Sequence, residues 1–162
     1  MNNEVSAGEW TLDATATAIG FQAKAAFGMK VNGRFNQYDS AITVGPSVAE
    51  SAISVIILTE SVDTGIKMRD AHLKADNVFA TVRFPTLEFR STAIVEAPTG
   101  LTVTGTLRIR DITQSVTFDA TRLTTAGPPR YNATVIVASK EYGITRLGTT
   151  VKVILDATLK RV

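Results

Sequence analysis

The chain has 162 residues, 44% of them hydrophobic, which suits one domain with a sizeable core and excludes a disordered chain. It has no cysteine, which excludes disulfides, thiolate metal sites and cysteine nucleophiles. Seventeen basic and fifteen acidic residues leave a net charge of +2, too small and too evenly scattered to favour a nucleic acid as partner.

The N-terminal stretch MNNEVSAGEW lacks the basic and apolar regions of a signal peptide. No run of about 18 apolar residues follows, so we expect no stable membrane insertion. These features favour a cytoplasmic protein. The alternative is a periplasmic or secreted protein whose signal peptide has been removed and replaced by Met1.

The first third of the chain alternates between apolar and polar residues, which predicts antiparallel strands. Residues 19–25, 29–35 and 42–44 follow this pattern. The segment Ser51–Glu60 is apolar on both faces, because Ile56 and Leu58 lie opposite the other isoleucine and valine side chains. A helix, a loop or a second subunit could cover its outer face, so a homodimer is one alternative.

A short helix is predicted over residues 64–74, with Thr64 as its N-terminal cap. In Val82–Arg90 the apolar positions change from even to odd numbers at Pro85. Because side chains alternate faces along a strand, this change predicts a β-bulge at Phe84–Thr86.

The second half predicts further long strands, of which Leu101–Ile109 has Gly105 in its middle, a site of close approach or kinking. No helices separate the strands, which argues against a parallel sheet. We therefore expect a single domain over residues 1–162, all-β, folded as an extended lipocalin-like antiparallel β-barrel of about eight strands. From the residues alone, the inward apolar side chains either fill a solid core or surround one slender ligand.

Several short motifs follow one another along the chain: V-x-G-x-F (Val31–Phe35), SVDTG (Ser61–Gly65), RDAHL (Arg69–Leu73), F-P-x-x-x-F-x-S-T (Phe84–Thr92) and V-x-G-x-L-x-I (Val103–Ile109). In this order they resemble the YceI-like family of polyisoprenoid-binding, lipocalin-like proteins. The resemblance extends from Trp10 to the last strand, although the family's usual Tyr-Pro is Phe84-Pro85 here.

The resemblance implies a hollow barrel that binds, sequesters or transports an isoprenoid lipid, either an isoprenoid quinone or a polyprenyl phosphate. A purely apolar tail needs only an apolar lining, so such a protein requires no catalytic residues or cofactors. The side chains expected to contact the ligand are Phe21, Phe27, Val31, Phe35, Val55, Ile57, Met68, Phe84, Phe89, Leu107, Phe118 and Val135.

His72 is the one histidine of the chain, so the sequence predicts neither a zinc site nor a catalytic centre. Arg69, Asp70 and His72 are expected either to fasten the helix across the barrel mouth as a lid or to contact the ligand's head group. The rival functions are a small barrel enzyme, a cyclase or isomerase acting on a hydrophobic substrate, and a dimeric interaction module using Ile56 and Leu58.

Overall fold

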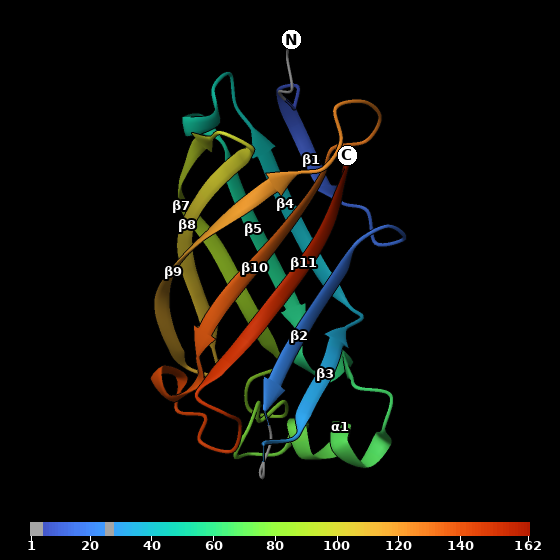
Figure 1. Cartoon of the computed structure of the whole chain (residues 1–162), viewed down its shortest axis with the longest axis vertical. Coiled ribbons are helices and arrows are strands. Elements are labelled where there is room, and N and C mark those ends of the chain that lie inside the picture. Colours follow the sequence, from blue (N-terminus) through green and yellow to red (C-terminus); the bar gives the residue numbers. More distant parts are fainter. Residues whose placement is uncertain (1–4, 25–27) are drawn as a thin grey trace.

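The computed structural model describes residues 5–24 and 28–162, which form a tall antiparallel barrel with one α-helix at its lower end (Figure 1). The helix α1 covers Lys67–Lys74. The strands are β1 (Gly8–Leu12), β2 (Ala18–Lys24), β3 (Lys30–Phe35), β4 (Tyr38–Val44), β5 (Ala52–Leu58), β6 (Val62–Asp63), β7 (Thr86–Ala97), β8 (Gly100–Ile109), β9 (Ile112–Arg122), β10 (Arg130–Ala138) and β11 (Thr150–Arg161).

Within the described ranges, these segments make eight long strands that close into a ring. The consecutive segments β1 and β2 both pair with β11, so together they act as one long strand. On their other side β1 pairs with β4 and β2 pairs with β3, and β3 and β4 are consecutive in the chain as well. Likewise β5 pairs with β4 and β6 pairs with β3. Each long strand therefore neighbours the next in sequence, and the first neighbours the last. The predicted fold class, an antiparallel barrel of about eight strands, is confirmed.

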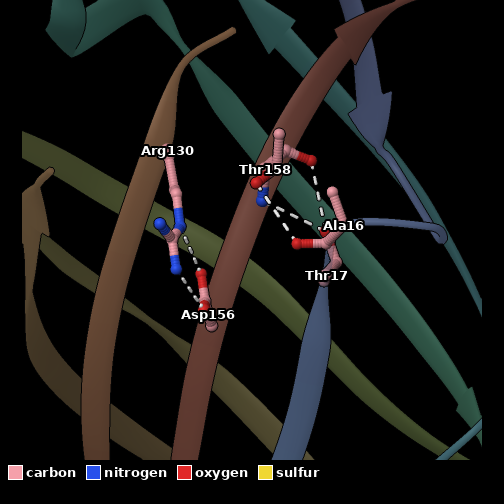
Figure 2. Close-up of polar contacts among 5 residues, drawn as sticks. All are labelled: Ala16, Thr17, Arg130, Asp156 and Thr158. Atoms are coloured by element: carbon pink, nitrogen blue, oxygen red, sulfur yellow. Dashed lines mark hydrogen bonds and ion pairs between the residues drawn. The ribbon is translucent and has the colours of Figure 1, made fainter. Parts of the chain in front are cut away.

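Threonine side chains bridge the break between β1 and β2, where the ladder to β11 is interrupted (Figure 2). The Thr17 hydroxyl accepts a hydrogen bond from the Thr158 amide at 3.1 Å and donates one to the Thr158 carbonyl at 3.2 Å. The Thr158 hydroxyl donates to the carbonyl of Ala16. Both threonines are buried, so these bonds replace missing strand pairing where water cannot reach the backbone.

The helix begins at Lys67, three residues later than the predicted start, and Thr64 does not cap it. The Thr64 hydroxyl instead donates to the Asp70 carboxylate at 2.6 Å and accepts a hydrogen bond from Arg69 Nε at 3.0 Å. The capping prediction is therefore wrong, because the first turn of the helix folds back onto Thr64.

The predicted bulge at Phe84–Thr86 is also misplaced. Residues up to Pro85 precede the strand, which begins at Thr86, so the change of phase there reflects turns. The register of β7 against β8 shifts instead between Ser91 and Ala93. This shift moves the inward face of β7 from odd-numbered residues to even-numbered ones.

Aromatic side chains fill the lower end of the barrel. The rings of Phe21, Phe35 and Phe79, here called the phenylalanine cluster, have centroids 5.4 to 6.4 Å apart. Leu73 of α1 is buried in the same core. Because these side chains pack across the barrel axis, the end next to α1 is closed.

Candidate functional site

The upper part of the barrel contains a cavity of about 890 Å³. This volume is near the upper end of the range in which proteins bury most of a small ligand's surface. Its walls are mainly apolar and come from alternate residues of the strands. On β5 they are Ile53, Val55 and Ile57, and on β11 they include Val153 and Leu155.

The cavity reaches the ends of β4, β7 and β9, which lie opposite α1 in Figure 1, and it opens there. Residues from four loop or terminal segments surround this opening, which we call the mouth: Ala7, Pro46, Thr99 and Thr125. At the other end the lining stops at Phe35, whose ring belongs to the phenylalanine cluster. The cavity is therefore a blind tunnel with one open end.

The tunnel has room for an extended chain. Its lining includes β8 from Gly100 at the mouth to Ile109 near the floor, about 30 Å at ~3.3 Å per residue along the tilted strand. Burial of one methylene group contributes about 0.8 kcal/mol, so about ten buried methylene groups contribute ~8 kcal/mol. This is comparable to the binding free energy of a micromolar complex, before the entropy cost of ordering the ligand is subtracted. A hydrocarbon tail needs no polar anchor to bind there.

Seven of the residues predicted to contact a ligand lie in the lining of this cavity. They come from six different strands, β3, β5, β7, β8, β9 and β10, so the alternation pattern identified the inward face in each. The seven are Phe35, Val55, Ile57, Phe89, Leu107, Phe118 and Val135.

Of the other five predicted residues, the four that the structure describes are absent from the lining. Phe21 and Val31 are buried in the core beside Phe35 and Leu73. Met68 is 73% exposed on α1. Phe84 packs against guanidinium groups, with the Arg110 group 5.5 Å from its ring centroid, and Phe27 lies outside the described residues.

The predicted lid residues lie at the closed end, because α1 is opposite the mouth. Arg69 donates to the Thr64 carbonyl at 2.8 Å, and Asp70 accepts from the Thr64 amide at 2.7 Å. His72 is exposed. These contacts fasten the helix to the preceding loop, as one of the two alternatives predicted. The helix, however, lies below the phenylalanine cluster at the closed end and not across the mouth.

Among the described residues of the lining, only Glu96 and Arg122 have charged side chains. Glu96 is exposed at the end of β7, whereas Arg122 is half-buried at the end of β9. By its charge alone, Arg122 would be expected on a solvated face of its strand. The signal that could have identified it is its phase, because Arg122 continues the inward series of Val116 and Phe118 at even-numbered positions.

Tyr142 lies in the core at the closed end, 1% exposed, and its hydroxyl has no hydrogen-bond partner among the described residues. Burial, with a smaller contribution from Glu141, raises the pKa of Tyr142 to about 12. A neutral phenol is thus held in an apolar environment.

In residues 5–24 and 28–162, no three His, Asp or Glu side chains gather as metal ligands usually do. Nor does this part of the chain contain a helix with the length and hydropathy needed to cross a membrane.

The family model described as the YceI-like domain matches residues 10–159. A UPF0312 protein of Shewanella denitrificans is 36% identical over 92 residues, covering 56% of this chain and 48% of that protein. A UPF0312 protein of Yersinia enterocolitica is 34% identical over 89 residues, covering 54% of this chain and 46% of the relative. These matches thus span about half the length of the relatives.

Solved structures share the fold at lower sequence identity. BcnA of Burkholderia cenocepacia superimposes with a TM-score of 0.81 at 19% identity, covering 92% of this chain and 99% of that one. A polyisoprenoid-binding domain from Saccharophagus degradans gives 0.71 at 17% identity, covering 94% and 98%. The Campylobacter jejuni YceI protein gives 0.69 at 22% identity, covering 79% and 83%.

Proposed function

The chain belongs to the YceI-like family, and on that premise we propose that it binds one long isoprenoid lipid inside its barrel and thereby sequesters or transports it. The observation that carries this proposal is the blind, mainly apolar tunnel of about 890 Å³. A solid core would leave no such volume, since protein interiors normally contain few voids larger than a water molecule.

The shape of the tunnel supports a tail-first orientation. Apolar residues such as Val55, Leu107 and Leu155 line the interior, and the charged side chains Glu96 and Arg122 lie at the mouth end of their strands. A lipid with an apolar tail and a polar head matches this order. The Saccharophagus domain, described as polyisoprenoid-binding, has the same fold and so supports this class of ligand.

Binding accounts for the site better than catalysis does. The lining is mainly apolar, its charged side chains among the described residues, Glu96 and Arg122, lie at the mouth, and His72 and Asp70 take no part in it. An enzyme acting by general acid and base would place titratable groups beside the bound substrate. We therefore propose a binding protein and not an enzyme.

Native mass spectrometry of protein purified without detergent, followed by solvent extraction and lipid analysis, tests this proposal. We expect a mass excess corresponding to one bound lipid, and an extract containing an isoprenoid quinone or a polyprenyl phosphate. Protein purified from cells supplemented with a long-chain prenyl lipid should show higher occupancy. A protein that remains free of lipid under both conditions would contradict the proposal.

A further inference from the structure

The junction between β9 and β10 is the least paired part of the barrel wall. These strands pair at only three positions, all at the mouth end, whereas β9 pairs with β8 at ten positions and β10 with β11 at nine. Of the other junctions between the eight long strands in the described residues, the one between β5 and β7 has the fewest pairs, five. Pairing of β9 with β10 stops at Ala120 and Ala133, and Figure 1 shows the two strands diverging below these residues. We call the unpaired stretch, Ile112–Asp119 beside Thr134–Ala138, the seam.

Apolar side chains close the seam in place of a backbone ladder. Val135 and Val137 of β10 are 6% and 3% exposed, and Tyr142 in the turn after β10 is 1% exposed. Val116 and Phe118 of β9 pack against the same core. The alternate, outward-facing residues of this part of β9 are exposed, so water can satisfy backbone groups that have no partner strand. The seam can therefore open without burying an unpaired backbone group.

The seam lies in the wall of the tunnel. Val116 and Phe118 on one side of it and Val135 on the other all line the cavity. A tail enclosed on every side can leave only along the axis, past a lining about 30 Å long. Separation of β9 from β10 would expose that length at once, because it opens the tunnel along its side.

Few contacts join the two strands at the mouth end of the seam. Beyond the three pairs, the Leu123 amide donates to the Arg130 carbonyl at 2.8 Å. Arg122 of β9 donates to the Tyr131 hydroxyl of β10 at 3.3 Å, and its guanidinium carbon lies 5.3 Å from the centroid of that ring. Each backbone hydrogen bond contributes little net stability, since its groups bond to water when it breaks. This short ladder should therefore open before the longer ladders that join β9 to β8 and β10 to β11.

Given the proposed function, on which this inference rests, we propose that the β9–β10 junction is a lateral portal. The three pairs at the mouth break, β9 and β10 separate along the seam, and the lipid tail enters and leaves through the side of the barrel. The mouth and the portal are then one continuous opening, which is narrow while the pairs are formed and wide when they are broken.

A disulfide across the short ladder tests the portal. The chain has no cysteine, so an introduced pair supplies the only thiols of the protein. Thr121 and Asn132 lie opposite each other in one of the three pairs. Opposed residues of antiparallel strands have Cα atoms about 4.5–5.5 Å apart, which a disulfide can span. Thr121→Cys/Asn132→Cys oxidised with glutathione disulfide should therefore lock the junction. The matched control is Thr104→Cys/Thr117→Cys, which locks β8 to β9, where the two hydroxyls are 3.1 Å apart.

The readout is lipid exchange in each variant, oxidised and reduced. Protein loaded with deuterated geranylgeranyl phosphate is mixed with an excess of the unlabelled lipid, and native mass spectrometry follows the replacement. We expect exchange in oxidised Thr121→Cys/Asn132→Cys to be slower than in its reduced form by about tenfold or more, because opening of the portal limits the rate. Adding a reductant should restore the rate. The oxidised and reduced forms of Thr104→Cys/Thr117→Cys should exchange equally fast.

Equal rates in the oxidised and reduced forms of Thr121→Cys/Asn132→Cys would overturn the portal while binding in the tunnel stands. Equal slowing in the oxidised control would also overturn it, because the effect would then be general stiffening of the barrel. A wild-type protein that takes up neither labelled nor unlabelled lipid would overturn the proposed function, and the portal with it.

Hydrogen exchange of the wild type tests the portal if the disulfide does not form. The amides of Thr121 and Asn132 belong to the short ladder and should exchange about tenfold faster, or more, than the amides of the β10–β11 ladder, since local opening exposes them first. Protection of both amides equal to that of the β10–β11 ladder would show that the junction opens only with the whole barrel, which would overturn the portal.

Discussion

Tyr142 is a buried polar residue whose hydroxyl contributes no hydrogen bond among the described residues. A buried donor without a partner loses its hydration and gains nothing in return. Tyr142→Phe removes this group and keeps the ring. We expect the variant to be as stable as the wild type or more stable by about 1 kcal/mol, measured by urea unfolding at pH 7.

The same variant should change how stability depends on alkaline pH. The pKa of Tyr142 is about 12 in the folded protein, against 10.0 for an ordinary tyrosine. The unfolded chain therefore loses this proton at a lower pH than the folded protein does. As a result, the free energy of unfolding declines as pH rises from about 10 to 12. Tyr142→Phe should lose less stability over that interval. Tyr38, whose pKa burial also raises, stays in the variant, so part of the decline should remain.

Loss of more than about 1 kcal/mol at pH 7 in Tyr142→Phe would show that the hydroxyl has a stabilising partner.

The sequence did not indicate Tyr142 as a core residue, because it follows the last residues of β10 in a short 3-10 turn, Ser139–Tyr142. Alternation identifies inward positions only within strands. Arg122 shows a second difficulty. Its position in the alternation of β9 directs it into the barrel, whereas its charge suggests a solvent-exposed side chain.

At the scale of elements, the inner wall depends on a glycine in β8. A Cβ atom at Gly105 would lie 2.3 Å from the Arg90 carbonyl and 2.6 Å from the Phe89 ring. The missing side chain leaves room for the Phe89 ring, which packs on Phe118 with ring centroids 5.7 Å apart. The predicted close approach at Gly105 is confirmed.

Gly105→Ala should therefore destabilise the barrel by about 1–3 kcal/mol, since the strand or the ring must move. Gly20→Ala is the matched control in the middle of β2. A Cβ atom there would meet its nearest neighbour, the Gly33 carbonyl, at an ordinary 3.4 Å, so we expect a change within ~0.5 kcal/mol. Thermal unfolding of both variants makes the comparison, and equal melting temperatures would refute this account of Gly105.

Elements with clean alternation were predictable, whereas their irregularities were not. The inward faces of β5 and β8 follow directly from Val55, Ile57 and Leu107. The bulge in β7 was placed at Pro85 because the apolar phase changes there, but the real shift occurs at Ser91–Ala93, in a polar stretch with no apolar marker. A register shift depends on the partner strand, which a single strand's sequence does not describe.

At the scale of the whole molecule, the barrel is a tunnel closed at one end and open at the other. The family resemblance and the strand pattern predicted a barrel, but the prediction placed the helix across the mouth, whereas the tunnel opens at the end opposite α1. That asymmetry arises because Phe21, Phe35 and Phe79, far apart in sequence, meet at the end near α1. Their meeting depends on the curvature and closure of the entire sheet.

The central claim is that a lipid tail occupies the tunnel, and two tryptophan substitutions test it most directly. Val55→Trp inserts a large ring into the lining, whereas Phe84→Trp makes an aromatic change outside it. Native mass spectrometry after incubation with geranylgeranyl phosphate should show one bound lipid in the wild type and in Phe84→Trp. Folded Val55→Trp, checked by circular dichroism, should bind at least tenfold less; binding equal to the wild type would contradict occupation of the tunnel.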